Sequence, residues 1–237
     1  MKAFLFSDLH DSYSQLKRLE NFLVGNDEID ILIFAGDVVN MGEPVGFMVQ
    51  FINLIDRVKK PFFWVPGNND FGPAYYKLKA RYPSLEGRVA ELPVSSIIPN
   101  TNPLIRFTGV GGSPASWAGQ YQGENMIDKK MIAGSIFISH VPPPGILNWQ
   151  KFDVTSPTSV CHSRESGNLD HRVKPEDDRP RGRRFKDSPA VHICGHIHHQ
   201  WGVAYLGQTK VIKLAAIERG YYAILDLESL KVEFERW

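Results

Sequence analysis

The chain has 237 residues, of which 43% are hydrophobic and 22% charged, and its formal net charge is +1. These values are ordinary for a globular domain, and the length suits one large domain better than two. A net charge this close to zero argues against a whole-chain attraction to nucleic acid or anionic lipid, and two cysteines allow at most one disulfide bond.

The apolar segments of the chain are short. They have the length of strands and are interrupted by charged residues, well below the roughly 20 residues that cross a bilayer. The first of them, residues 3–6, ends before Asp8 and is also shorter than the apolar stretch of a signal peptide. We therefore expect no membrane association and a cytoplasmic location.

Apolar runs and amphipathic patterns alternate through the first part of the chain. Helices are predicted over residues 14–24 and 45–58, where apolar residues recur at helical spacing. Continuous apolar runs are typical of strands that are covered on both faces. Such strands are predicted, in chain order, at 3–7, 29–35, 62–65, 135–139 and 190–194. This alternation indicates right-handed βαβ units.

The last part of the chain is richer in strands. Alternating or apolar segments separated by turns occur at 204–206, 211–215, 221–227 and 232–234. Together with the earlier elements, they predict an α/β fold of two packed sheets with helices outside.

A polar segment interrupts this pattern between residues 156 and 188. It has many charged, Pro and Ser residues and almost no large apolar ones, so it cannot bury enough surface to offset its conformational entropy. We interpret it as a disordered insertion within a single domain spanning 1–237, and its sequence resembles translated interspersed palindromic DNA repeats. The alternative is a basic arm for nucleic acid, built from the arginines of 179–184 and Lys186, but the acidic run 176–178 weakens it.

Residue types that bind metals follow each of the five predicted strands of the first group. The carboxyl ends of strands in an open α/β sheet are where ligands bind. Glycines at 36, 67 and 195 let the backbone turn sharply there. Each such residue alone could serve as a helix cap or turn residue, but their coincidence favours a metal centre. The seven are Asp8, His10, Asp37, Asn68, His140, His196 and His198.

These spaced motifs resemble the calcineurin-like metallophosphoesterase family, in its small single-domain form. The motifs of the family are DxH, GDxx(D/N), GNH(D/E), H and GHxH. The corresponding residues of this chain are 8–10, 36–40, 67–70, 140 and 195–198. The resemblance covers nearly the whole chain outside the polar segment. It implies a four-layer α-β-β-α sandwich with two mixed β-sheets flanked by helices.

The resemblance also implies two divalent metal ions and assigns their ligands. One ion would be held by Asp8, His10 and His198, the other by Asn68, His140 and His196, and Asp37 would bridge both. Mixed imidazole and carboxylate ligands suit Mn, Fe or Zn better than Mg or Ca. Two such cations can polarise phosphoryl oxygens and hold a hydroxide for in-line attack.

The expected function is therefore hydrolysis of a phosphate ester of a small molecule, a diester rather than a monoester. The expected catalytic residues are Asp37, Asn69, His140 and His196. Asn69 departs from the family, which usually has histidine there to protonate the leaving group or contact the phosphate. An amide cannot supply a proton at neutral pH, so we expect a preference for leaving groups that depart without protonation. A second departure is residues 213–220, where relatives often carry an Asn-Pro-Gly-Ser type turn.

Two alternative functions and several weaker site candidates accompany this interpretation. A nuclease would need a basic or aromatic track, which is not evident outside the polar segment. A scaffold without turnover usually lacks metal ligands, whereas all seven are present here. The glycine-rich segment 109–114 could face a phosphate, and Trp117 and Tyr121 could line a pocket. His192 and Cys194 are expected to pack inside a strand. The sequence does not indicate the natural substrate or the oligomeric state.

Overall fold

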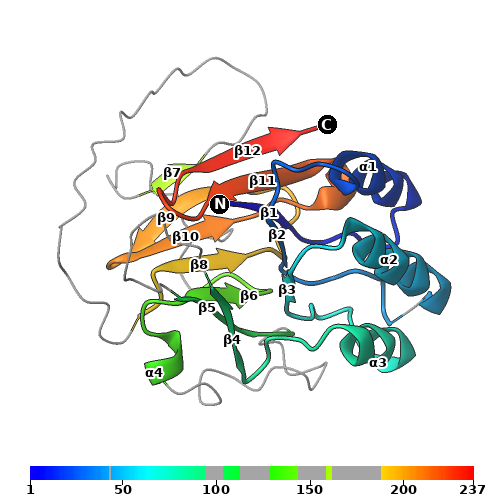
Figure 1. The fold of residues 1–237 in the computed structure, drawn as a ribbon, viewed down its shortest axis with the longest axis horizontal. Helices are drawn as coiled ribbons and strands as arrows, with labels where there is room; N and C mark the ends of the chain where they lie inside the picture. Colours follow the sequence, from blue (N-terminus) through cyan, green and yellow to red (C-terminus); the bar gives the residue numbers. More distant parts are fainter. Residues whose placement is uncertain (43, 94–103, 113–128, 144–158, 162–187) are drawn as a thin grey trace.

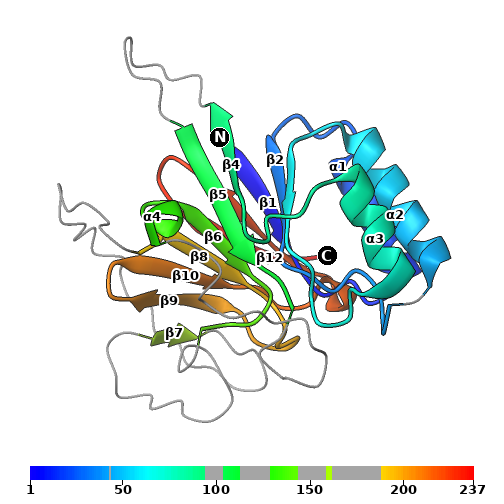
Figure 2. The ribbon, with the colours of Figure 1, turned by 90° about the horizontal axis from the view of Figure 1, so that it is seen from below.

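The structure is a computed structural model that describes residues 1–42, 44–93, 104–112, 129–143, 159–161 and 188–237. Two mixed β-sheets pack against each other, and three helices cover the outer face of one of them (Figures 1 and 2). The two mixed sheets with flanking helices confirm the expected fold class. Among the described residues, no helix has both the length and the apolar character needed to cross a bilayer.

The first sheet has five strands in the order β12-β11-β1-β2-β3, with β1 at its centre. Strands β1, β2 and β3 run parallel, whereas β11 and β12 are antiparallel to their neighbours. The bounds are β1 Lys2–Phe6, β2 Ile31–Phe34, β3 Phe62–Trp64, β11 Tyr221–Asp226 and β12 Val232–Arg236. Helices α1 Tyr13–Leu23, α2 Val45–Val58 and α3 Gly72–Arg81 lie on its outer side (Figure 2).

The second sheet has seven strands in the order β4-β5-β6-β8-β10-β9-β7, of which β5, β6, β8 and β10 are parallel. The bounds are β4 Val89–Pro93, β5 Leu104–Val110, β6 Ile136–Ser139, β7 Ser159–Cys161, β8 Val191–Cys194, β9 Gly202–Leu206 and β10 Thr209–Lys213. The short α4 Lys129–Ile132 lies on the side away from α1–α3 (Figure 2). A turn of 3-10 helix, η3 Ile217–Arg219, leads into β11.

The side chains of β1 show why the strand is apolar from Ala3 to Phe6. Phe4 and Phe6 belong to the core beneath α1–α3, whereas Ala3 and Leu5 belong to the core between the two sheets. All four are fully buried. Because successive side chains of a strand point to opposite faces, a central strand that is covered on both sides must be continuously apolar.

The predicted elements agree with the structure apart from small shifts at their ends. Helix α2 has the predicted bounds, and α1 begins and ends one residue earlier than predicted. Helix α3 was not predicted, because it buries only Ala74 and Leu78 and so shows little apolar periodicity. Within the polar segment 156–188, residues 159–161 form β7 at the edge of the second sheet. Residues 156–158 and 162–187 lie outside the described residues, so the interpretation as a disordered insertion stays a prediction.

Candidate metal centre

The seven predicted metal-ligand side chains lie together, where five strands of the two sheets end. Asp8 and His10 follow β1, Asp37 follows β2 and Asn68 follows β3 in the first sheet. From the second sheet, His140 follows β6, and His196 and His198 follow β8. The ligand atoms of five of them form two groups that share Asp8, and within each group the atoms lie within 4.8 Å of one another. The groups are Asp8 with His10 and His198, and Asp8 with Asp37 and His140.

The backbone at these turns adopts a conformation that is uncommon for residues other than glycine. Asp8, His10, Asp37 and His196 have φ angles of 56°, 45°, 63° and 72°. A left-handed backbone at a residue with a Cβ costs on the order of 1–3 kcal/mol, and such residues cluster at functional sites. The surrounding hydrogen bonds hold this conformation. For example, the N–H of Asp8 donates to the carbonyl of Gly36 over 2.8 Å.

Two glycines allow the buried carboxylates to approach the backbone closely. A Cβ added at Gly67 would lie 2.0 Å from Oδ1 of Asp37. A Cβ added at Gly195 would lie 2.7 Å from Oδ2 of Asp8. Neither distance leaves room for a side chain. The glycines of the third and fifth motifs are therefore required by the closeness of the carboxylates, in addition to the turns that the sequence suggested.

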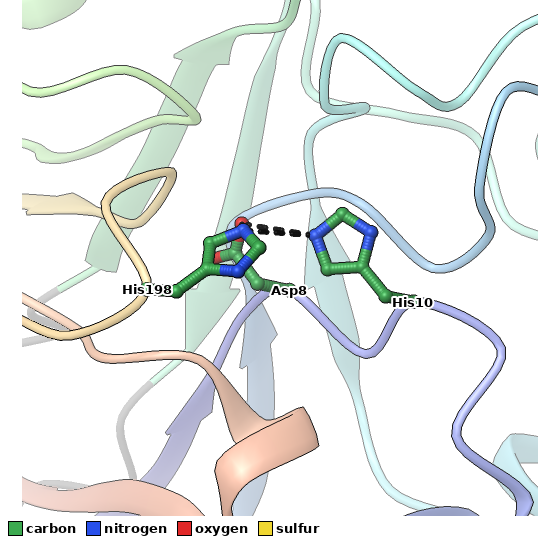
Figure 3. A group of neighbouring side chains, drawn as sticks. All are labelled: Asp8, His10 and His198. Carbon is green, nitrogen blue, oxygen red and sulfur yellow. Dashed lines mark hydrogen bonds and ion pairs between the residues drawn. The ribbon is translucent and has the colours of Figure 1, made fainter.

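The first group joins Asp8, His10 and His198 from the two sheets (Figure 3). Oδ1 of Asp8 lies 3.4 Å from Nε2 of His198 and 3.7 Å from Nε2 of His10. It is buried and accepts no hydrogen bond from any described residue. The other oxygen, Oδ2, accepts the backbone N–H of His196 over 3.0 Å. A buried carboxylate oxygen without a donor, facing two imidazole nitrogens, fits a cation ligand.

Hydrogen bonds on the far side of each ring determine which nitrogen faces this group. Nδ1–H of His10 donates to Oδ1 of Asn40 over 2.9 Å, and Nδ1–H of His198 donates to Oε1 of Glu218 over 2.8 Å. The two Nε2 atoms then lie 3.0 Å apart. They can share a hydrogen bond only if one ring carries a second proton. A divalent cation between them would bind both lone pairs, so the donor set fits a metal ion.

The second group is centred on His140, which is fully buried. Its Nδ1–H donates to the carbonyl of Ala35 over 2.8 Å, which directs Nε2 toward the centre. There Nε2 lies 3.2 Å from Oδ2 of Asp37, 3.0 Å from Oδ1 of Asn68 and 3.1 Å from Nδ1 of His196. Carboxylate, amide and imidazole acceptors therefore converge on one point, as they do around a bound cation.

Asp37 belongs to the second group and also lies near His10 of the first. Its Oδ2 is 3.2 Å from Nε2 of His140 and 3.7 Å from Nε2 of His10. Both oxygens also accept hydrogen bonds of 2.8 Å from Asn69, Oδ1 from the backbone N–H and Oδ2 from Nδ2. The side chain of Asn69 therefore points at the carboxylate that the resemblance assigns to both ions.

The pKa values of two histidines show how strongly this site attracts positive charge. Burial alone would lower the pKa of His140, but the charges of Asp37 and Asp8 raise it to about 9. Contacts with Asp8 and Glu218 raise the pKa of His198 to about 10. Protons on these two rings balance the carboxylates, and a metal ion would replace them on binding.

Three further residues, Asp70, Asn40 and Glu218, support the site, although none of them was predicted as a site residue. Buried Asp70 accepts N–H groups of Asp37 and Gly67 over 2.7 and 2.9 Å. Asn40 and Asp70 belong to the matched motifs, so the spacing could have found both of them. Glu218 stands 20 residues after His198 in a segment where the chain departs from the family, and no spacing pattern marks it.

The weaker candidates have more ordinary positions. His192 is buried, and its Nε2 lies 2.7 Å from Oγ of Ser139, while Cys194 is a buried free thiol. Both pack in β8 as expected. His199 is exposed. Trp117, Tyr121 and the last residues of the segment 109–114 lie outside the described residues.

Comparisons with known proteins agree with this geometry. A sequence model of the family described as Calcineurin-like phosphoesterase matches residues 1–200. One relative is the 3',5'-cyclic adenosine monophosphate phosphodiesterase CpdA of Haemophilus influenzae, 38% identical over 48 residues, which are 20% of this chain and 17% of that protein. The match thus spans about a sixth of the curated relative.

Two solved structures share the fold. TT1561 of Thermus thermophilus has a TM-score of 0.60 and 14% identity, over 99% of this chain and 98% of the other. The purple acid phosphatase PPD1 of yellow lupin, Lupinus luteus, has a TM-score of 0.52 and 11% identity, over 100% of this chain and 51% of the other. With its motifs, its two sheets and a family match over most of its length, the chain belongs to the calcineurin-like phosphoesterase family.

Proposed function

We propose that the protein is a phosphoesterase that depends on two divalent metal ions and hydrolyses a phosphate ester, a diester in preference to a monoester. The observation that carries this proposal is the convergence of seven acceptor side chains at the ends of five strands: five of them form two groups that share Asp8, and Asn68 and His196 contact His140. Membership of a family of metal-dependent phosphoesterases supports it.

The proposed ligands are those that the family resemblance assigns, and the distances between their acceptor atoms support this choice. One ion would be held by Asp8, His10 and His198, and the other by Asn68, His140 and His196. Asp37 would contact both, which its position between Nε2 of His10 and Nε2 of His140 supports. The donor set is compatible with Mn, Fe or Zn. When bound, such a pair of ions polarises the phosphoryl group and activates water at neutral pH.

The residues of the chain have separate tasks in this proposal. The carbonyl of Ala35, Oδ1 of Asn40 and the carboxylate of Glu218 each hold one imidazole by its Nδ1–H, so that the opposite nitrogen is directed inward. Asn69 holds Asp37 by two hydrogen bonds. An amide in that place has no proton to give to a departing alkoxide, so the proposed reaction does not rely on Asn69 as an acid.

The preference for a diester rests on the comparison with a known phosphodiesterase. The relative from Haemophilus influenzae is a phosphodiesterase, although the match spans only 17% of its length. A small-molecule substrate is proposed, because the described residues outside the polar segment provide no basic track for nucleic acid.

The test compares hydrolysis of bis-p-nitrophenyl phosphate and p-nitrophenyl phosphate by Mn-loaded protein. We expect turnover that requires the metal and is greater on the diester. The variant Asp37→Asn, which keeps the size of the side chain, should lose this turnover. The control Asp27→Asn on the exposed surface should retain it. Turnover that survives both chelation and Asp37→Asn would refute the two-metal mechanism. Two bound metal ions without turnover would indicate that Asn69 or the polar segment disables catalysis, and the absence of bound metal would point to a scaffold.

A further inference from the structure

The 3-10 helix η3 lies directly against two of the proposed ligands. The backbone N–H of Glu218 donates to the carbonyl of Asp8 over 3.1 Å. The backbone N–H of Ala216, at the start of the same turn, donates to the carbonyl of His198 over 3.1 Å. The backbone around η3 is therefore fixed to the loop after β1 in one sheet and to the loop after β8 in the other.

The side chain of Glu218 also contacts the group formed by Asp8, His10 and His198. Its Oε1 accepts a hydrogen bond of 2.8 Å from Nδ1–H of His198. The opposite nitrogen, Nε2, lies 3.0 Å from Nε2 of His10 and 3.4 Å from Oδ1 of Asp8. Glu218 therefore determines both the tautomer of His198 and the direction in which its free nitrogen points.

Glu218 differs in charge from the groups that hold His10 and His140. Nδ1–H of His10 donates to the neutral amide oxygen of Asn40, and Nδ1–H of His140 donates to the neutral carbonyl of Ala35. The acceptor at His198 is a carboxylate. A carboxylate increases the basicity of the ligating nitrogen more than a neutral oxygen does, so the group containing His198 receives a stronger donor.

Contacts with helix α1 hold Glu218 in this place. Nε2 of Gln15 donates to the backbone carbonyl of Glu218 over 3.2 Å. Oε1 of the same Gln15 accepts Nε1–H of Trp237 over 2.6 Å. Both ends of the Gln15 amide are thereby engaged, which fixes its orientation. The position of η3 is thus determined from α1 as well as from the two sheets.

We propose that Glu218 is a positioning residue that strengthens the binding of the metal ion held by Asp8, His10 and His198, and of that ion alone. This inference rests on the proposed dinuclear function. Loss of a group that holds a ligating histidine typically costs 10–100-fold in metal affinity. We therefore expect Glu218→Gln to lower the affinity for one of the two ions by about 10–100-fold, while the affinity for the other stays within about threefold.

The experiment titrates metal-free protein with Mn²⁺ and measures free Mn²⁺ by electron paramagnetic resonance. The wild-type chain should bind two ions, and Glu218→Gln should bind one ion as tightly and the other more weakly. The visible absorption spectrum of the Co²⁺-loaded protein should change in the same variant, because the geometry at His198 changes. The matched control is Glu233→Gln, whose carboxylate contacts the exposed Lys231 and is far along the chain from any ligand.

Each outcome decides the question. Two ions in the wild type with unchanged affinities and an unchanged Co²⁺ spectrum in Glu218→Gln would overturn this inference and leave the proposed function standing. An equal loss of affinity for both ions, with a lower melting temperature of the metal-free variant, would indicate a merely structural role for Glu218. That outcome would also overturn this inference. A wild-type chain that binds no metal would refute the proposed function and this inference with it.

Discussion

Asn69 donates to both oxygens of Asp37, through its backbone N–H and through Nδ2, each over 2.8 Å. The usual histidine of the third family motif would place a titratable ring in the same position. Asn69 therefore replaces a group that can transfer a proton with a group that only orients a carboxylate. The effect of this single difference should depend on how much the leaving group needs a proton.

The substitution Asn69→His tests this dependence. If the imidazole protonates the leaving group, turnover on an alkyl phosphodiester should rise by at least roughly 10-fold, within the ~10²–10⁴-fold range of general acid catalysis. Turnover on bis-p-nitrophenyl phosphate should change much less, because p-nitrophenolate departs without a proton. The measurement is kcat/KM for both esters with Mn-loaded protein. An equal change on both esters would contradict the explanation.

Asp70 is a buried carboxylate that accepts backbone N–H groups from both neighbouring strand ends. The donors are Asp37 over 2.7 Å, Val38 over 2.8 Å and Gly67 over 2.9 Å. Burial and the nearby charge of Asp37 raise the pKa of Asp70 to about 6. The carboxylate therefore holds the turn that carries Asp37 against the turn that carries Asn68.

The variant Asp70→Asn should be destabilised, because an amide NH₂ would face N–H donors that now face an oxygen. Leaving buried N–H groups without an acceptor costs about 1–3 kcal/mol each, so we expect the free energy of unfolding to fall by at least about 2 kcal/mol. Urea unfolding of the metal-free protein measures this. Asp27→Asn on the exposed surface is the control and should unfold as the wild type does.

At the scale of elements, two glycines allow opposite predictions for the same substitution. Gly67 lies between β3 and α3, and a Cβ there would lie 2.0 Å from Oδ1 of Asp37. Gly46 lies in α2, where an added Cβ would meet nothing within 4 Å. Gly67→Ala should displace Asp37, abolish metal binding and lower the free energy of unfolding by about 1–3 kcal/mol. Gly46→Ala should raise it by up to about 1 kcal/mol.

Calorimetric metal titration and urea unfolding of both variants check this pair. The comparison separates the general effect of a methyl group from its effect at the turn after β3. Normal metal binding by Gly67→Ala would mean that the turn can relax, and it would contradict the close approach as the reason for glycine.

The elements that could be predicted from the sequence are those with a strong pattern. Apart from the exposed Lys2 at the start of β1, strands β1 and β2 are apolar because both faces are covered. Helix α2 has apolar residues at helical spacing and was predicted with its observed bounds. Helix α3 buries few residues, and β4 is at most partly buried, so neither has a marked apolar pattern. Their places follow from contacts with distant segments, which a local pattern does not contain.

The candidate site likewise contains residues that the sequence indicated and contacts that it did not. Asp8, Asp37 and His140 each follow a predicted strand, so sequence order alone indicated that their side chains could meet. Glu218 reaches His198 because η3 crosses from one sheet to the other, and this path has no sequence signature. The contact of Asn69 with Asp37 likewise depends on a side-chain direction that the motif does not specify.

At the scale of the whole molecule, the centre joins the two sheets, because each proposed ligand group takes side chains from both. A ligand that binds only the folded state stabilises it by about 2.7 kcal/mol at a concentration 100 times its dissociation constant. For a chain of this length, that corresponds to a rise in melting temperature of roughly 5–10 °C.

We therefore expect chelation to lower the melting temperature by about this amount and Mn²⁺ to restore it. Differential scanning calorimetry with and without a chelator measures the shift. The melting temperature of Asp37→Asn should change much less between chelator and Mn²⁺. This difference from the wild type would exclude a general effect of the added salt. Equal melting temperatures of the wild type with and without Mn²⁺ would contradict the proposed centre.

The order β12-β11-β1-β2-β3 has a consequence for the synthesis of the chain on the ribosome. Strand β1 is made first, yet one of its two neighbours is β11, whose register pairs Lys2 with Asp226. At roughly 5–20 residues per second, on the order of 10–40 s pass before that neighbour emerges. During this interval one edge of β1 has no partner strand, and an unpaired edge of an apolar strand is the kind of surface that chaperones bind and that aggregates. Both proposed ligand sets also take a histidine from the loop after β8, so metal loading would follow the synthesis of that loop.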